Sequence, residues 1–578
     1  MKITFGNFLC GVGVGGLLVL AGLPAFAQSA ETSTASPARV QEQILKPGFN
    51  QREMPVLSVR EQGTQSAPAG SEKIKFTLQS ISMDGATALP DSQTRATYAD
   101  LVGQTISLAD LYGVAEQITR LYRNSGYILT QVIVPPQTIE GGNARLSVVE
   151  GFIDRVSVNM EQGAKSEPAS AMKLIRDYAG RIPSGRALNV KDLERYILLI
   201  NDLPGVEARG VISPSANKTG AADLMIMVRR NPMDGLIAID NYGTRYLGPV
   251  QLSGAVVANS WLGNNESLTG QLVVAPGFED NANLELGYGM VSYGHTLNAS
   301  GLKVDLTASY TSTDPGYTLA DLGVHGTSRF LGAALSYPAI RTRSTNLYTT
   351  LKFDTQDVET RNDFEDTRKD SIRALRGGVR VEHLDALLGA GLNTLDLELS
   401  KGLDLFGASE REDANKSRAE GDSGFLKLTA EYQRLQRLAP QWNLLFGVKG
   451  QLSNDALLSA EEFGVGGMSY GRGFDPSEII GDEGLAGKLE LQWNMAGELA
   501  FTHSNQFYGF FDAGRIWNDD PATNSQKSDT VTSAGLGVRS RIMDYTAMDM
   551  ALAFPLNRDV ETQGDDDPRF YFSLSRKF

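Results

Sequence analysis

Cysteine is nearly absent from this chain, because its 578 residues contain a single one, Cys10. Cys10 lies in an N-terminal segment that we expect to be removed, so the mature chain would have no thiol. A chain without thiols cannot form disulfides, bind zinc through cysteine or use a cysteine nucleophile.

Histidine is also scarce, and catalytic motifs are missing. The four histidines are scattered without the spacing of metal ligands: His295, His325, His383 and His503. No nucleophile elbow, phosphate-binding loop or zinc-binding helix is found. We therefore expect no cofactor, no metal and no enzymatic activity. The acidic run 565–567 is interpreted as a solvated loop, with a calcium site as the alternative.

Long apolar runs are missing after the N-terminus, where no stretch approaches about 18 residues, the length that a spanning helix needs. Positive charge is also in deficit, since the net charge is −15. An acidic chain is a poor partner for phosphate backbones, so we expect no nucleic acid.

The N-terminus has the pattern of a secretory signal peptide over residues 1–27. Lys2 supplies a positive charge, an apolar stretch covers residues 8–23, and Ala25-Phe26-Ala27 is a small-x-small cleavage site. Cleavage there would leave Gln28 as the first mature residue. The alternative is a retained transmembrane helix, which the short, glycine-rich run disfavours.

Residues 28–72 are rich in Ser, Thr, Ala, Pro and Gln, which is typical of a linker. One short piece, Pro37 to Leu45, predicts an isolated helix with proline at its start. So short a helix is marginal by itself in water, so other parts of the protein must hold it if it is ordered.

Residues 73–151 predict a compact β-α-α-β-β module. Residues 75–81 alternate like a strand, and Ser107 with Asp110 forms a capping box for a helix that Gly126 ends. Two further strands are expected over 128–134 and 144–149, with Gly141-Gly142 in the turn between them.

The same order of elements is expected again over residues 152–230. Asn189 caps a helix, residues 202–205 stop it, and strands follow over 206–212 and 222–228. The chain therefore predicts a tandem pair of small α+β domains.

From residue 231 to the end, helical periodicity gives way to strand-like alternation with charged residues at every second position. Leu395, Leu397 and Leu399, for example, alternate with polar residues. Alternation of this kind, with 61 glycines and only 41 % hydrophobic residues, is typical of a large barrel with one wet face. The 578 − 230 = 348 residues hold about 16 to 18 strands. The alternative is a soluble sandwich or propeller.

The last ten residues support the barrel. Phe570, Phe572, Leu574 and Phe578 fall on one face of a final strand that ends in phenylalanine. This pattern resembles the terminal signal by which outer-membrane barrels are recognised for insertion.

One barrel segment, residues 463–476, has too many glycines for a lipid-facing strand and carries Arg472 between two of them. We interpret it as the tip of a loop that folds back into a tight space, where the arginine needs a carboxylate partner. Asp512, in the apolar segment 510–514, is the candidate partner. The alternatives are an ordinary exposed Arg472 and an unpaired Asp512 on the pore wall.

These segments carry a family resemblance. The loop motif Gly471, Arg472, Gly473 and Phe474 resembles the Val-Arg-Gly-Tyr/Phe loop of the outer-membrane protein-assembly and translocation barrels, with glycine in place of the usual valine. The wall motif Phe510, Asp512 and Gly514 resembles the strand motif of the same superfamily. The paired modules resemble its POTRA (polypeptide-transport-associated) domains. Two of them before one barrel is the layout of the two-partner secretion (TpsB) transporters, the ShlB/FhaC/HecB type.

The resemblance implies a fold, a function and partners. The fold is a transmembrane antiparallel β-barrel of about 16 strands, residues 231–578, after POTRA domains over 73–151 and 152–230. The 37–45 helix would be a pore plug, and the Arg472 loop would gate the pore. The cargo would be a secreted β-rich exoprotein, adhesin or haemolysin-like, and outer-membrane lipids and the barrel-assembly machinery would be further partners. The location would be the Gram-negative outer membrane, with the POTRA domains in the periplasm. Rival functions are a barrel-assembly factor, a porin-like channel and an enzyme.

Overall fold

A computed structural model describes residues 34–44, 57–59, 65–161, 168–215, 218–277, 283–363, 368–498, 502–519 and 527–578. The predicted signal peptide, with Cys10, and the predicted first mature residue Gln28 lie outside these ranges. Within them, no helix combines the length and the apolar character needed to cross a membrane.

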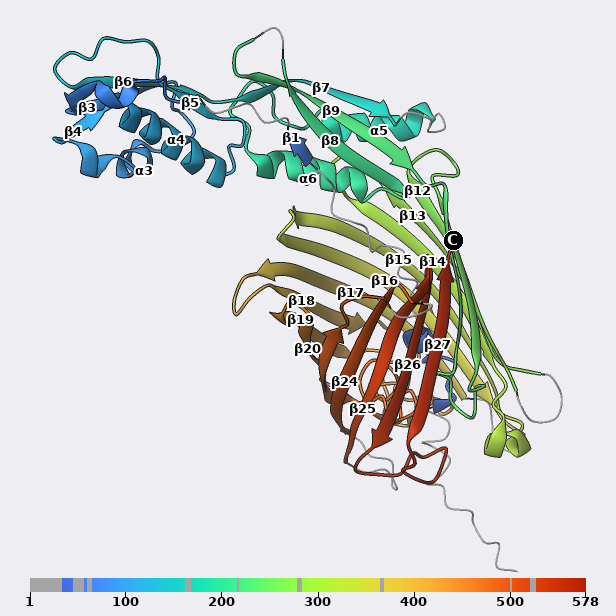
Figure 1. Ribbon diagram of the computed structural model, residues 1–578. Helices are drawn as coiled ribbons and strands as arrows, with labels where there is room; N and C mark the ends of the chain where they lie inside the picture. The colour runs from blue at the N-terminus through green and yellow to red at the C-terminus, as the bar shows by residue number, and fades with distance from the viewer. Residues whose placement is uncertain are drawn as a thin grey trace, which may run out of the picture.

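The C-terminal part forms a closed antiparallel barrel, as the sequence predicted, and 16 described strands build its wall (Figure 1). Each strand pairs with the next along the chain, except that β20 pairs with β23, and β10 closes the ring on β27. The strands are β10 (Met233–Asp240), β11 (Gln251–Asn259), β12 (Glu266–Pro276), β13 (Leu284–Thr296), β14 (Lys303–Thr313), β15 (His325–Arg341), β16 (Thr345–Arg361), β17 (Arg368–Asp385), β18 (Gly391–Gly402), β19 (Leu426–Ala439), β20 (Trp442–Ser453), β23 (Glu483–Asn494), β24 (Ser504–Trp517), β25 (Ser528–Met543), β26 (Thr546–Pro555) and β27 (Arg569–Lys577).

Side chains alternate between the two faces of the wall. On β24 the Phe511 side chain is 48 % exposed on the outer face, whereas its neighbour Asp512 is fully buried on the inner face. An apolar outer face and a polar inner face are what a strand needs between lipid and a wet lumen. At the seam, Phe578 and Gly235 exchange backbone hydrogen bonds of 2.9 and 3.0 Å.

The first α+β module lies at the far end of the molecule from the barrel (Figure 1). Its three-stranded sheet has the order β3-β6-β5, with β3 parallel and β5 antiparallel to β6. Ser107 and Asp110 form the predicted capping box. Its elements are η1 (Ser71–Lys73), β2 (Lys75–Thr77), β3 (Ser80–Asp84), α3 (Asp91–Ala96), η2 (Ala99–Leu101), β4 (Thr105–Ser107), α4 (Leu108–Asn124), β5 (Gln131–Ile133) and β6 (Asn143–Val149).

Two strand predictions in this module were wrong in detail. The single strand expected over 75–81 is broken in two, because β2 pairs with β4 in a separate two-stranded sheet while β3 pairs with β6. The strand expected over 128–134 is only three residues long, β5. The ends of a strand depend on the strands with which it pairs. These strands lie far along the chain, so the local alternation of residues does not predict where the pairing stops.

The second module repeats the topology of the first. It comprises β7 (Phe152–Met160), α5 (Ala169–Ala179), α6 (Val190–Asn201), β8 (Val206–Pro214) and β9 (Ala221–Arg230). Its sheet has the order β1-β8-β9-β7, so β9 is central like β6, and β8 corresponds to β5. The additional strand β1 (Leu57–Val59) comes from the linker and pairs in parallel with β8. Asn189 caps α6 as expected, whereas the sequence analysis did not single out α5.

The second module packs against the turns at one end of the barrel (Figure 1). Arg341, at the end of β15, donates two hydrogen bonds of 2.9 and 2.8 Å to the Asp202 carboxylate that follows α6. Arg195 of α6 donates to the carbonyl of Pro338 at 3.1 Å. These contacts hold α6 against the end of β15 at the mouth of the pore.

The N-terminal segment, residues 34–44, lies inside the barrel, where Figure 1 shows it in blue. Its helix α2 (Val40–Gln43) is shorter than the predicted Pro37–Leu45 helix. Residues 37–39 form a turn instead, and Leu45 lies outside the described residues. Val40 is buried in an apolar cluster with Tyr246 and Tyr288 of the barrel, so tertiary packing holds the segment.

Candidate functional site

A long loop between β20 and β23, residues 454–482, folds back into the barrel; we call it the lumenal loop. It contains the short hairpin β21 (Phe463–Val465) and β22 (Ile479–Gly481). Its apolar side chains pack on the inner wall, with Val465 and Phe474 fully buried against residues such as Ile516. A loop that packs on the inner wall narrows the path through the barrel.

Arg472 at the tip of the lumenal loop meets Asp512 on the inner face of β24. Its Nε and Nη2 atoms lie 2.8 Å from the two Asp512 oxygens, in a bidentate arrangement. The backbone N–H groups of Gly471 and Arg472 donate to the same carboxylate at 3.2 and 3.1 Å. The structure thus brings together the two residues that the sequence singled out, in the strongest geometry for a charge-assisted pair.

A second carboxylate, which the sequence analysis missed, completes the arginine site. The Nη1 atom of Arg472 donates to Glu490 of β23, and its guanidinium lies 3.7 Å from the centre of the Phe510 ring. Glu490 also accepts hydrogen bonds of 2.6 and 3.1 Å from Arg539 of β25. Glu490 lies in a strand with ordinary alternation, so no local signal distinguishes it.

The glycines of both motifs are explained by close contacts. A side chain at Gly514 would overlap Val465 of the hairpin, and one at Gly473 would overlap Ser533 of β25. Gly471 has φ +96°, a conformation that residues with a side chain rarely adopt. Glycine in place of the family's valine therefore suits the backbone that this loop has.

The lumenal loop is anchored at a second place close to the barrel seam. Asp475, which follows the arginine motif, is fully buried and accepts a 2.6 Å hydrogen bond from Arg569 of β27. It also accepts a hydrogen bond from the Thr562 hydroxyl. The strand that closes the ring is therefore tied directly to the loop.

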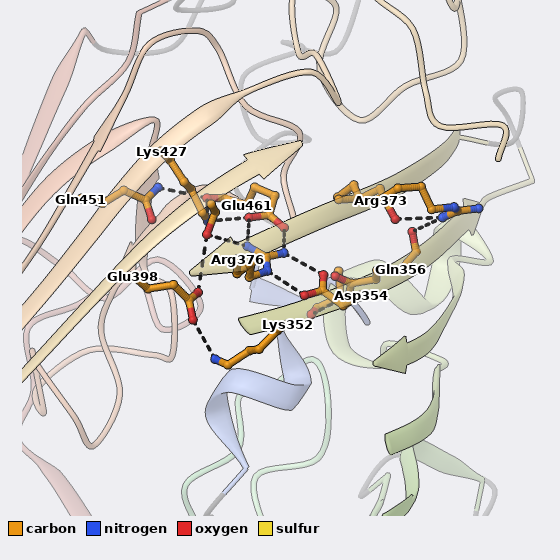
Figure 2. A network of polar contacts seen from close by, with 12 residues as sticks. Lys352, Asp354, Gln356, Arg373, Arg376, Glu398, Lys427, Gln451 and Glu461 are labelled. Atoms are coloured by element: carbon orange, nitrogen blue, oxygen red, sulfur yellow. Dashed lines mark hydrogen bonds and ion pairs between the residues drawn. The ribbon is translucent and has the colours of Figure 1, made fainter. Parts of the chain in front are cut away.

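A third anchor lies on another part of the wall (Figure 2). Glu461, at the base of the loop, pairs with Arg376 of β17 at 2.7 Å and with Lys427 of β19 at 2.5 Å. Arg376 also binds Asp354 of β16 through bonds of 2.8 and 3.0 Å. This network could not be predicted from the sequence, because its members come from four separated segments that only barrel closure brings together.

Arg39 ties the N-terminal segment to the lumenal loop. Its side chain is 1 % exposed and donates to Ser477 Oγ at 3.1 Å, to the Ser459 carbonyl at 2.9 Å and to the Glu462 carbonyl at 3.1 Å. All three partners belong to the loop. Among the described residues, the segment has no strand pairing with the wall. Side-chain and packing contacts therefore hold it, and these can be broken one at a time.

The linker covers equivalent strand edges of the two modules. On the second module, β1 occupies the edge of β8. On the first, the Gln65 amide accepts from the Val134 N–H at 2.9 Å and donates to the Val134 carbonyl at 3.4 Å, just beyond β5. The amide thus imitates the backbone of a paired strand. Gln65 also lines a small pocket between β5 and α4.

The remaining predicted site residues lie on the surface. Phe570, Leu574 and Phe578 are 55, 40 and 56 % exposed on the outer face of the barrel, and Phe572 is partly buried. The 565–567 run is exposed. In the part of the chain that the structure describes, no group of His, Cys, Asp and Glu is arranged to hold a metal ion.

Comparison with known proteins gives consistent matches. The family model "Haemolysin secretion/activation protein ShlB/FhaC/HecB" matches residues 220–540, and the model "POTRA domain, ShlB-type" matches residues 76–151. The heme/hemopexin transporter protein HuxB of Haemophilus influenzae is 24 % identical over 82 % of each chain. The outer membrane transporter CdiB of Escherichia coli is 27 % identical over 86 % of this chain and 83 % of CdiB.

Solved structures share the fold. The structure of CdiB from Escherichia coli matches with a TM-score of 0.69 and 21 % identity, over 97 % of this chain and all of that one. BamA from Haemophilus ducreyi, lacking POTRA domains 1–3, matches with a TM-score of 0.51 and 14 % identity, over 87 % of this chain and all of that one.

Proposed function

Because the chain belongs to the haemolysin secretion/activation (ShlB/FhaC/HecB) family, we propose that it exports one exoprotein through its own barrel, in a two-partner secretion system. It is an outer-membrane protein with its POTRA region in the periplasm. HuxB of Haemophilus influenzae and CdiB of Escherichia coli are transporters. The cargo here is an adhesin or haemolysin-like protein, rich in β-structure.

The observation that carries this proposal is that two parts of the chain itself, the N-terminal segment and the lumenal loop, occupy the lumen. The N-terminal segment is held by Arg39 and by the apolar contacts of Val40, without strand pairing in the described residues. The lumenal loop is held by ion pairs of Arg472, Asp475 and Glu461. A barrel blocked by its own chain is unsuited to constant diffusion of small solutes. It suits a pore that opens when a cargo engages it.

Cargo docks first on the periplasmic modules. We assign residues 73–151 and 152–230 as the two POTRA domains. An unfolded segment adds to the edge of β5 through backbone hydrogen bonds, which tolerate many sequences. The small pocket beside α4 adds selectivity. Docking displaces Gln65, and the linker then draws the N-terminal segment out of the lumen.

Arg472 gates the pore in this scheme. Its pairs with Asp512 and Glu490 keep the loop in the closed arrangement, and exchange of these partners lets the loop move aside. Folding of the cargo outside the cell biases the movement, so no nucleotide is needed. The exposed Phe570, Leu574 and Phe578 face is read by the barrel-assembly machinery during biogenesis.

Removal of the protein from cells tests the function. We expect one exoprotein to vanish from the medium while the other outer-membrane barrels keep their levels. A general loss of barrels would instead indicate an assembly factor, the rival that the BamA-like fold leaves open. Unchanged secretion with reduced solute uptake would indicate a porin.

Crosslinking tests the exit of the plug. The Gln41 Oε1 and Ser309 Oγ atoms lie 3.4 Å apart, and the only native cysteine is Cys10 in the predicted signal peptide. We expect a Gln41→Cys/Ser309→Cys double variant to secrete normally until a short, cleavable thiol crosslinker joins the two residues. Each single-cysteine variant is the control. Normal secretion by the crosslinked protein would show that the segment need not leave.

A further inference from the structure

A cavity of about 790 Å³ lies between the second module and the outside of the barrel wall. Helix α5 forms one side of it, and the ends of β12 and β13 with their turns form the other. The residues that matter for its chemistry are Lys173, Arg176, Arg181, Asn265, His295 and Leu297. None of them takes part in the lumenal site.

The β13 side of the cavity belongs to the lipid-facing surface. Tyr288 of β13 packs against the N-terminal segment in the lumen, so even-numbered positions of this strand point inward. Val291, at an odd-numbered position, is 57 % exposed on the outer face. Tyr293 and His295 share that face and line the cavity at the periplasmic end of the strand. The cavity therefore opens at the level of lipid headgroups.

The charge of the cavity is opposite to that of the chain. Three cations, Lys173, Arg176 and Arg181, line it with one carboxylate, Asp177, whereas the whole chain carries −15. Asp177 is paired with Lys173 at 2.8 Å. Within the described ranges, neither arginine makes an ion pair. The Nδ1 atom of His295 is buried and has no hydrogen-bond partner there.

The walls of the cavity are held together by three hydrogen bonds. Ser170 donates to the Gly263 carbonyl at 2.5 Å, and Asn265 donates to the Ala171 carbonyl at 3.0 Å. Tyr178 donates to the Asn298 carbonyl at 3.4 Å. These bonds fix the helix that carries the cations against the barrel wall.

An apolar anchor lies beside the cavity. Trp261 and Leu262, in the turn between β11 and β12, are 77 and 71 % exposed. Large apolar side chains exposed at the end of a membrane barrel belong to the interfacial girdle, where tryptophan is enriched. The cations therefore lie where the headgroups of the periplasmic leaflet meet the wall.

We propose that this cavity binds an anionic phospholipid of the periplasmic leaflet. The phosphate accepts hydrogen bonds from Arg176 and Arg181, since guanidinium groups suit phosphate oxygens. The His295 imidazole faces the glycerol and headgroup oxygens, and the acyl chains lie along the outer wall beside Val291. A lipid bound here joins the second module to the barrel, in addition to the Arg341–Asp202 pair.

Native mass spectrometry of the full-length protein, with phosphatidylglycerol or phosphatidylcholine added to the detergent, tests the proposal. We expect one phosphatidylglycerol to remain bound in preference to phosphatidylcholine. An Arg176→Gln/Arg181→Gln variant should bind phosphatidylglycerol about tenfold or more weakly. Each basic side chain near a membrane surface strengthens the binding of anionic lipid, and this variant loses two of them. Arg155→Gln removes an exposed cation of the same module outside the cavity and should change nothing.

Other outcomes would overturn the proposal. Equal retention of both lipids, or an unchanged affinity in the double variant, would exclude an anionic lipid site here. Displacement by inorganic phosphate at a concentration equal to that of the lipid would show that the cavity takes free phosphate. Heat-modifiable migration in gels checks that each variant still forms its barrel. Because the readout is lipid retention, it is independent of whether the chain secretes an exoprotein.

Discussion

The Nε atom of Arg39 donates a hydrogen bond of 3.1 Å to the Oγ atom of Ser477, a residue 438 positions further along the chain. The bond joins the N-terminal segment directly to the loop that carries Arg472. The two obstacles in the lumen are therefore one connected unit. Movement of either one weakens the hold on the other, and this coupling has measurable consequences.

Loss of the Arg39 side chain should loosen the N-terminal segment. An Arg39→Ala variant loses three buried donors to the lumenal loop, each hydrogen bond from a charged group contributing about 1.5–3 kcal/mol. We expect a higher open probability in planar-bilayer conductance recordings. Gln41→Ala, which removes one 3.4 Å contact with Ser309, is the matched control. Equal conductance of Arg39→Ala and wild type would contradict the assignment of Arg39 as the main anchor.

Loss of Arg472 should release the lumenal loop and impair secretion. Arg472→Ala leaves the buried Asp512 and Glu490 carboxylates without this partner, at a cost of about 3–5 kcal/mol. We expect faster protease cleavage of the loop and a strong loss of exported protein. Arg515→Ala, on the exposed face of β24, is the control.

A simple exchange of Arg472 and Asp512 should rescue little. The exchange places a new carboxylate beside Glu490, which already binds Arg472 and Arg539. Adding Glu490→Gln to the exchange should recover more secretion than the exchange alone. If the exchange alone restored full secretion, Glu490 would have no part in holding the loop.

Removal of the Gln65 amide should expose the edge of the first module. Gln65→Ala frees the N–H and carbonyl of Val134, so an extended cargo peptide no longer competes with the linker. We expect peptide affinity to rise by about twofold to tenfold, the effect of one modest hydrogen bond. Fluorescence anisotropy with a labelled cargo peptide measures it. Gln104→Ala removes a glutamine side chain that donates to the Asp100 carbonyl in the same module, and this variant should bind the peptide as wild type does.

Acid should destabilise the first module through Glu150. Burial raises the pKa of Glu150, but hydrogen bonds from Thr87, Ala88 and Tyr122 outweigh it and lower the pKa overall. The N–H groups of Thr87 and Ala88 both donate at 2.7 Å. The pKa of a glutamate in the unfolded chain is about 4.3. Because the pKa of Glu150 is lower in the folded protein, its carboxylate stabilises the fold above that pH, and this stability is lost as the pH falls through the folded-state pKa.

Hydrogen exchange of residues 76–151 in the full-length protein measures this loss. In the wild type, protection of these amides from exchange should fall as the pH drops below about 4.3. A Glu150→Gln variant should be less protected at neutral pH and respond less to acid in that window. An identical pH dependence of the two proteins would assign the acid sensitivity to other groups.

Local patterns were sufficient for the class of each region. Alternation after residue 231 and the length of that region predicted a barrel of about 16 to 18 strands, the family resemblance implied about 16, and the closed ring has 16 described strands. The Ser107–Asp110 capping box and the Asn189 cap were predicted correctly, because a cap depends only on neighbours within a few residues. The Arg472–Asp512 contact could be anticipated because a glycine-flanked arginine in a lipid-embedded region needs a nearby carboxylate.

Contacts between distant segments could not be read from the chain. Packing against Tyr246 and Tyr288 holds the N-terminal segment in the lumen, and β2 separates from β3 because each has a different partner. The Glu461–Arg376–Asp354 network joins three segments whose charges, taken singly, resemble ordinary pore-facing residues.

The sequence by itself determined which residues face lipid and which face water, because strand alternation and glycine placement are local properties. Only the tertiary structure decided what fills the lumen. Closing the ring brings Glu490, Arg376 and Arg569 of the wall next to the charged residues of the lumenal loop. Burial of charge is stable only where such partners converge, and convergence is a property of the closed barrel.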